Sequence, residues 1–186
     1  SRDPASGQPR RSTPLATDVE ITTCARCHSR RGKLTEDYRH GAPLGDRYRL
    51  ALLDPGLYHA DGQVLDEVYV HGSFLQSRMH AAGVTCSDCH EPHSLRLRAE
   101  GDALCATCHE ATRYTAREHH HHDPAGEPAR CTSCHMPATT YMVIDPRRDH
   151  SLRVPRPDLS VSLGVPDACN RCHQDPCRPT ARRIGI

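Results

Sequence analysis

The sequence has very few aromatic residues: no Trp, one Phe and six Tyr among 186 residues. Only 36% of the residues are hydrophobic, the mean hydropathy is −0.69, and 15 Pro and 12 Gly interrupt regular structure. Side chains of this composition are too few to fill a core of the size usual for this length. The composition therefore excludes an ordinary globular core built from side chains alone.

Long hydrophobic runs are also missing, which excludes a membrane-spanning helix in this sequence. The 24 Lys and Arg residues are balanced by 23 Asp and Glu, giving a formal net charge of +1. A chain without a strong basic excess is a poor candidate for binding nucleic acid, so we expect no nucleic-acid partner.

What the sequence does contain is the pattern Cys-x-x-Cys-His, five times. We call the copies motifs I to V: Cys24–His28, Cys86–His90, Cys105–His109, Cys131–His135 and Cys169–His173. The pattern is typical of covalent c-type haem attachment, in which two thiols bind the porphyrin and the His binds its iron. A zinc site would pair Cys-x-x-Cys units without requiring the His, and a disulfide framework would not need five identical units.

We therefore predict five c-type haems. The predicted thioether residues are Cys24, Cys27, Cys86, Cys89, Cys105, Cys108, Cys131, Cys134, Cys169 and Cys172. The predicted proximal iron ligands are His28, His90, His109, His135 and His173. With two propionates per haem, five ferric haems would add about −5 to the charge, giving about −4 in total.

Haem also repairs the missing core, because each porphyrin presents a large apolar face. We expect a mostly irregular fold with short α-helices, a stacked haem core and little or no sheet, unfolded without haem. The expected division is an N-terminal arm (1–20), a pentahaem domain (21–173) and a C-terminal tail (174–186). The arm is polar and Pro-rich, so it needs a surface to order it, for example on a neighbouring subunit. Apolar residues at helical spacing predict one longer helix over 63–80, weakened by Gly72.

Ten His lie outside the motifs, while Met is rare, so we predict a second His ligand at each iron and low potentials. The candidates for these distal positions are His40, His80, His93, His119, His120, His122 and His150. Because adjacent residues point in different directions, one or two of the run 119–122 are expected to face iron. His59 and His71 are reserves, and Met79 and Met142 are weaker alternatives.

Several stretches resemble a known family: HGAPLGDRY (40–48), DEVYVHGSFLQSRMHAAGVTCSDCHEPHS (66–94), CHMPATTYMVIDPRRDHS (134–151) and PRPDLSVSLGVPDACNRCH (155–173). They are similar to the multihaem cytochrome c region of bacterial tetratricopeptide-repeat proteins, related to the cytochrome c-554-like group. The resemblance implies a pentahaem electron-transfer fold, with ligand positions at His40, His93, His150 and within the run 119–122. Unlike that family, this sequence shows no helical repeats after motif V.

The first functional hypothesis is electron transfer through closely packed haems to redox partner proteins or extracellular acceptors. One version is a filament of copies stacked end to end, sealed by the arm or by Cys177, the cysteine outside the motifs. Cys177 could equally be a free thiol. The alternatives are a soluble periplasmic carrier, or a haem oxidoreductase acting on nitrogen oxides or hydroxylamine, which needs an open iron position. Since cytochrome c maturation occurs outside the bacterial cytoplasm, we expect a periplasmic or extracellular protein whose targeting segment was removed before Ser1.

Overall fold

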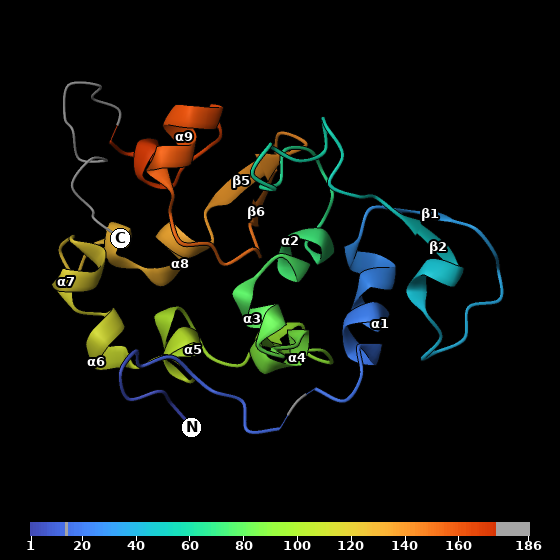
Figure 1. The fold of residues 1–186 in the computed structure, drawn as a ribbon, viewed down its shortest axis with the longest axis horizontal. Helices are drawn as coiled ribbons and strands as arrows, with labels where there is room; N and C mark the ends of the chain where they lie inside the picture. The colour runs from blue at the N-terminus through green and yellow to red at the C-terminus, as the bar shows by residue number, and fades with distance from the viewer. Residues whose placement is uncertain (14, 174–186) are drawn as a thin grey trace.

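Short helices joined by irregular segments make up most of the chain in the computed structural model, which describes residues 1–13 and 15–173 (Figure 1). The α-helices are α1 Val19–His28, α2 His71–Leu75, α3 Arg78–Ala81, α4 Cys86–Cys89, α5 Asp102–Ala106, α6 Ala111–Tyr114, α7 Arg117–His120, α8 Cys131–His135 and α9 Pro157–Leu163. Single 3-10 turns are η1 Leu44–Asp46, η2 Glu127–Ala129 and η3 Cys169–Arg171. The prediction of a mostly irregular fold with short helices is confirmed.

Strands occur in three antiparallel pairs within the described residues. They are β1 Arg31–Lys33 with β2 Tyr48–Leu50, β3 His90–Glu91 with β4 Arg96–Leu97, and β5 Ala138–Tyr141 with β6 Asp145–Arg148. Each pair is isolated from the others, so these residues form no extended sheet. This agrees with the prediction of little or no sheet.

The side-chain core is thin. Among residues 1–13 and 15–173, the buried hydrophobic residues are Ile21, Ala25, Leu44, Tyr48, Tyr58, Val68 and Val165. By contrast, several large apolar side chains are exposed, Val143 to 92% and Leu95 to 87%. A chain of this length cannot be held by so few buried apolar groups, as its composition predicts. No helix of the described part combines the length and apolar character needed to cross a membrane.

The predicted helix over 63–80 is wrong in its first half. Residues 63–70 are irregular, and helical structure begins only with α2 and resumes in α3 after a break at Ser77, whose side chain caps α3. Tyr69 adopts a positive φ of 59°, which no regular helix accommodates. Gly72 lies against the hydroxyl of Tyr58, so its missing Cβ makes room for a buried side chain.

Residues 1–13 of the N-terminal arm lie against the same chain. It folds back on itself, with Asp3 and Gln8 joined by a 2.8 Å backbone hydrogen bond. The Arg2 guanidinium donates to the carbonyls of Cys108 (2.8 Å) and Ala106 (3.1 Å), at motif III. In Figure 1 the arm runs beneath α6, α5 and α4 before it reaches α1. The expected C-terminal tail and Cys177 lie outside the described residues.

Candidate haem-binding site

Local helical structure presents the Cys and His residues of four of the five motifs on one face. In α1 and α8 the two Cys and the His occupy positions i, i+3 and i+4, which lie on the same side of a helix. Motifs III and V reach the same arrangement with a single turn: the amides of His109 and His173 donate to Cys105 and Cys169 carbonyls, both at 2.9 Å. In motif II the helix α4 ends at Cys89, and His90 is extended. Four motifs therefore aim both thiols and the imidazole toward one side, as covalent haem attachment requires.

Neighbouring motifs in the sequence are also neighbours in space. Burial, together with the adjacent Cys24 thiol, raises the pKa of Cys86 to about 12. Because Cys24 belongs to motif I and Cys86 to motif II, these two motifs are neighbours in space. Burial also raises the pKa of Cys89, with Cys105 of motif III nearby.

The same order continues through the second half of the chain. The Cys131 thiol donates a hydrogen bond to Cys105, which is the main reason why the pKa of Cys131 is raised and that of Cys105 lowered, and this contact brings motifs III and IV together. Burial raises the pKa of Cys134, and Cys172 is one of the groups near it. Motifs IV and V are therefore neighbours as well. The structure thus sets the five motifs in a row in their sequence order.

Three predicted distal residues lie opposite motif histidines. The rings of His119 and His135 are stacked with centroids 6.1 Å apart and planes at 17°. His150 stacks on His90 at 6.4 Å and 22°. A third pair, His122 and His173, is tilted by 38° at 5.9 Å.

This spacing fits one iron between each pair of rings. Two imidazoles bound to a metal ion from opposite sides have centroids about 6 Å apart, because each metal–nitrogen bond is about 2 Å and each ring adds about 1 Å. The residues at motifs II, IV and V therefore fit a haem whose iron binds two histidines.

Backbone carbonyls fix the tautomer of these rings. The Nδ1–H of His135 donates to the Arg153 carbonyl at 2.6 Å, and that of His150 to the Arg148 carbonyl at 2.9 Å. His122 makes the same kind of bond to the His120 carbonyl. Each leaves Nε2 as the unprotonated nitrogen, which is the pattern of metal-binding histidines. No sequence pattern pointed to Arg148 or Arg153, because their contribution comes from the backbone.

Desolvation favours the neutral form of several rings. It lowers the pKa of His90, with neighbouring His28 adding to the effect, and of His119, with His135 adding. It also lowers the pKa of His109 and His150. Neutral imidazole is the form that binds iron.

The remaining distal candidates are placed differently. Both ring nitrogens of His120 are occupied: Nε2 bonds to the Thr115 carbonyl (3.1 Å) and Nδ1 accepts from the His122 amide (3.1 Å). His40 lies beside motif I, with Nδ1 3.4 Å from Thr23 Oγ1. His80 meets the edge of Phe74 at 5.6 Å rather than a motif histidine.

His93 and the reserve histidines are not paired with a motif histidine either. His93 is exposed in the turn between β3 and β4. Burial lowers the pKa of His71, with His80 nearby. The backbone carbonyl of His59 closes a turn by accepting from the Gly62 amide at 2.9 Å. The weaker alternative Met142 is 64% exposed at the tip of the β5–β6 hairpin.

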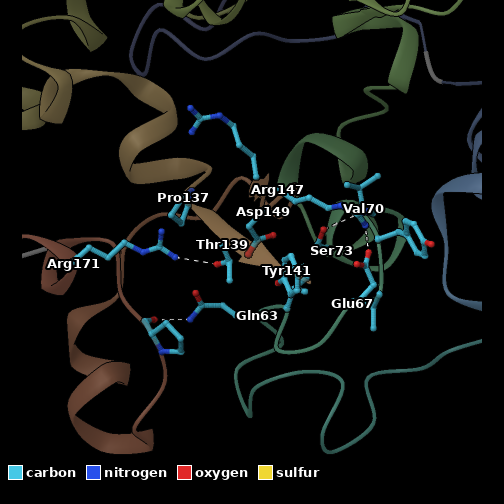
Figure 2. A pocket seen from close by; sticks show the side chains of 15 residues that line it. Gln63, Glu67, Val70, Ser73, Pro137, Thr139, Tyr141, Arg147, Asp149 and Arg171 are labelled. Carbon is cyan, nitrogen blue, oxygen red and sulfur yellow. Dashed lines mark hydrogen bonds and ion pairs between the residues drawn. The ribbon is translucent and has the colours of Figure 1, made fainter. Parts of the chain in front are cut away.

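Two pockets accompany the motifs but are small. The one in Figure 2 has a volume of about 40 Å³; Arg147 pairs with Glu67 beside it, and Arg171 donates to Thr139 Oγ1 at 3.2 Å. The other, lined partly by Leu52 and His71, has about 260 Å³. Pockets for organic ligands usually have about 300–1,000 Å³. The chemistry of the motifs, rather than a pocket, therefore defines this site.

The chain is similar to known cytochromes in part of its sequence and in its fold. Residues 92–174, which include motifs III to V, match the family model of cytochrome c7 and related cytochrome c. No curated protein sequence matches the chain. Among solved structures, the crystal structure of the outer cell wall cytochrome OcwA is similar in fold, with a TM-score of 0.54 and 16% identity. The match covers 88% of this chain and 50% of that one, so this chain spans about half the length of OcwA.

These findings support a multihaem c-type cytochrome and an electron-transfer role through c-type haems. The family match is the evidence for c-type haem, because a structural likeness at 16% identity shows the fold alone. The prediction from sequence of a c-type cytochrome that transfers electrons is thus supported.

Proposed function

We propose that the chain transfers electrons through five c-type haems, one attached at each motif. The observation that carries the proposal is the near-parallel placement of the His119 and His135 rings and of the His150 and His90 rings, at centroid distances that suit one iron between each pair. A haem bound in this way supplies a one-electron Fe(III)/Fe(II) couple. An iron with two histidine ligands has no open position for a substrate, which favours conduction over catalysis.

The proposed roles follow from the placements above. The ten motif cysteines form the thioethers, and the five motif histidines are the proximal ligands. His150, His119 and His122 are the proposed distal ligands for motifs II, IV and V. His40 is proposed for motif I because it lies beside α1, while His80 and His93 remain candidates for motif III. His120 is not included, since both its nitrogens are engaged.

The order of the motifs gives the proposed route its direction. In Figure 1 helix α1, with motif I, lies to the right of centre with the β1–β2 pair beyond it, and α8, with motif IV, lies toward the left end of the long axis. The thiol contacts between consecutive motifs support sites that follow one another along this axis. Electrons would then enter near one end of the molecule and leave near the other.

Mass spectrometry and electron paramagnetic resonance (EPR) of the purified, matured protein test the proposal. Peptide mapping is expected to find one haem on each of the five motif peptides, and EPR to show low-spin ferric signals. Replacing Cys131 and Cys134 with Ala should remove one haem and leave the other four peptides modified. Fewer than five haems in the unchanged protein would contradict the proposed number.

A haem oxidoreductase acting on nitrogen oxides or hydroxylamine is the second candidate, and one observation bears on it. The ring that contacts His109 of motif III is Tyr114, at 5.7 Å, rather than a histidine. An iron there without a distal ligand would give a high-spin signal that shifts when nitrite or hydroxylamine is added. Low-spin signals alone, unchanged by either compound, would rule against this activity.

We also propose a periplasmic or extracellular location, because cytochrome c maturation takes place outside the bacterial cytoplasm. The partners would be redox proteins or extracellular acceptors. Placement of the motifs along the long axis supports a filament of copies joined end to end, in which the row of sites continues from one copy to the next. Electron microscopy of concentrated native protein tests this: filaments are expected, and discrete particles alone would contradict it.

A further inference from the structure

We propose that Tyr114 is a positioning residue that sets the orientation of the iron ligands at motifs III and IV, and that the N-terminal arm holds it there. This inference rests on the proposed haem attachment at those two motifs. It assigns a role to a tyrosine and to an arm that the Cys-x-x-Cys-His pattern does not include.

Tyr114 stands between two imidazoles. Its ring meets His109 of motif III at 5.7 Å and 87°, and His119 at 5.1 Å and 83°. Edge-to-face contacts between aromatic rings at these distances are favourable. His119 in turn stacks on His135 of motif IV. One phenol ring therefore limits the rotation of the proximal ligand of motif III and of the proposed distal ligand of motif IV.

The hydroxyl of Tyr114 is fixed by the arm. It donates to the Ser6 carbonyl and accepts from the Gln8 side chain at 2.8 Å. The Glu110 amide, at the start of α6, donates to the Gly7 carbonyl at 3.3 Å. Because both hydrogen-bonding functions of the hydroxyl are engaged, the phenol is held in place and is not itself offered to iron.

Further contacts attach the arm to the same region. Arg113, the neighbour of Tyr114 on α6, donates to the Ala5 carbonyl at 2.6 Å. Arg2 bonds to two carbonyls of motif III, as described above. A salt bridge joins Arg11 to Asp88 of motif II at 2.8 Å. The arm thus spans motifs II and III and carries the two residues that hold the Tyr114 hydroxyl.

The contacts of Tyr114 should affect the orientation of the iron-binding imidazoles rather than the fold of the chain. Groups that contact a metal-binding imidazole fix its orientation and tune the metal. Removing the Tyr114 ring frees two imidazoles that belong to two different irons. It should therefore change the signals of two haems while the other three stay as they are.

The test uses the full matured chain in three forms: Tyr114→Leu, Tyr114→Phe and the control Tyr141→Leu, which removes a ring at the pocket of Figure 2. Tyr114→Leu is expected to shift the low-spin EPR signals and the potentials of two of the five haems. Tyr114→Phe keeps the ring but loses both hydrogen bonds to the arm, so we expect a smaller shift of the same two signals and faster protease cleavage within residues 1–11. Tyr141→Leu should change neither.

The outcomes separate this role from the proposed function. Five haems with unshifted signals in Tyr114→Leu would overturn the role of Tyr114 alone. Absence of haem from the motif III and IV peptides of the unchanged protein would overturn the proposed function there, and this role with it. If Tyr114→Leu does not mature, Gln8→Ala replaces it: faster arm cleavage with a shift of the same two signals supports the role, and unchanged cleavage and signals overturn it.

Discussion

The imidazole rings of His119 and His135 lie opposite each other, with centroids 6.1 Å apart and planes only 17° from parallel. The two residues come from different elements, α7 and α8, and are separated by the turn η2. His135 is oriented by the Arg153 carbonyl, so its Nε2 is the nitrogen left for metal. This pair therefore has the features of two axial ligands of one iron, and it provides a direct test of the site.

Replacing His119 with Ala should remove one axial ligand at motif IV. In the matured protein we expect one of five low-spin EPR signals to be lost and a high-spin signal to appear, with haem content unchanged. The matched control is His121→Asn, two residues along, where φ is +60° and Asn is well tolerated. His121→Asn should leave all signals in place. The same loss in both variants would mean that the signal reports the local fold and not ligation by His119.

The partner of Arg153 should matter for stability. Asp61 has only 6% of its side chain exposed and accepts from Arg153 Nη1 at 3.2 Å. Breaking a buried pair leaves an uncompensated charge, at a cost of about 3–5 kcal/mol, and partial exposure of Arg153 reduces this to about 2–3 kcal/mol for Asp61→Ala. Denaturant unfolding of the matured protein measures the change. Asp158, whose pair with Arg156 is exposed on both sides, serves as the comparison, and Asp158→Ala should have no measurable effect.

Substitution of Gly72 should reverse the usual effect of Gly-to-Ala changes in helices. Ala is favoured over Gly by about 1 kcal/mol in a helix. At Gly72, however, a Cβ would overlap the hydroxyl of buried Tyr58. Overpacking of this kind costs about 1–3 kcal/mol, so we expect Gly72→Ala to lower the free energy of unfolding. Adding Tyr58→Phe, which removes the overlapping hydroxyl, should recover part of the loss; no recovery would show that the strain lies elsewhere.

Attachment of the arm should depend on pH through Asp3. Hydrogen bonds from the backbone of Ala5 and Ser6 lower the pKa of Asp3 below its ordinary value of 3.8, with Arg10 contributing less. A carboxylate with a lowered pKa stabilises the folded arm above the ordinary value and loses this effect as the pH falls through the folded value. Protection of the amides of residues 1–10 against hydrogen exchange, relative to the exchange rate of an unfolded peptide at the same pH, should therefore be constant near neutral pH and fall below pH 3.8. In Asp3→Asn the protection should be low throughout; a fall at the same pH would exclude Asp3 as the cause.

The sequence predicted the parts of the site that depend on local spacing. The five motifs, the short helices and the lack of an extended sheet among the described residues follow from a repeated five-residue pattern in a chain with few apolar residues. Within the run 119–122, spacing could not decide which ring faces a motif histidine. The structure sets His119 and His122 opposite His135 and His173, whereas hydrogen bonds from both sides engage His120.

Contacts between distant segments could not be predicted in this way. The periodicity over 63–80 resembled one helix, but Tyr58, outside that window, occupies the space beside Gly72, and Tyr69 turns the chain. The arm is held by bonds such as that of Arg2 to the Cys108 carbonyl. A backbone carbonyl is present at every residue, so no sequence pattern indicates which one such a side chain will reach.

Removal of haem attachment provides the broadest test of how this fold is stabilised. Ordering the backbone costs about 1–2 kcal/mol per residue, and the few buried hydrophobic side chains, such as Tyr58 and Val68, cannot offset this over the whole chain. We therefore expect the chain with every motif Cys replaced by Ala to lack a cooperative unfolding transition and to show the far-ultraviolet circular dichroism of a coil. The matured protein should unfold cooperatively under the same conditions. Slow hydrogen exchange in α1 and α8 of the unattached chain would contradict this, because it would show that side chains alone sustain the helices that carry the motifs.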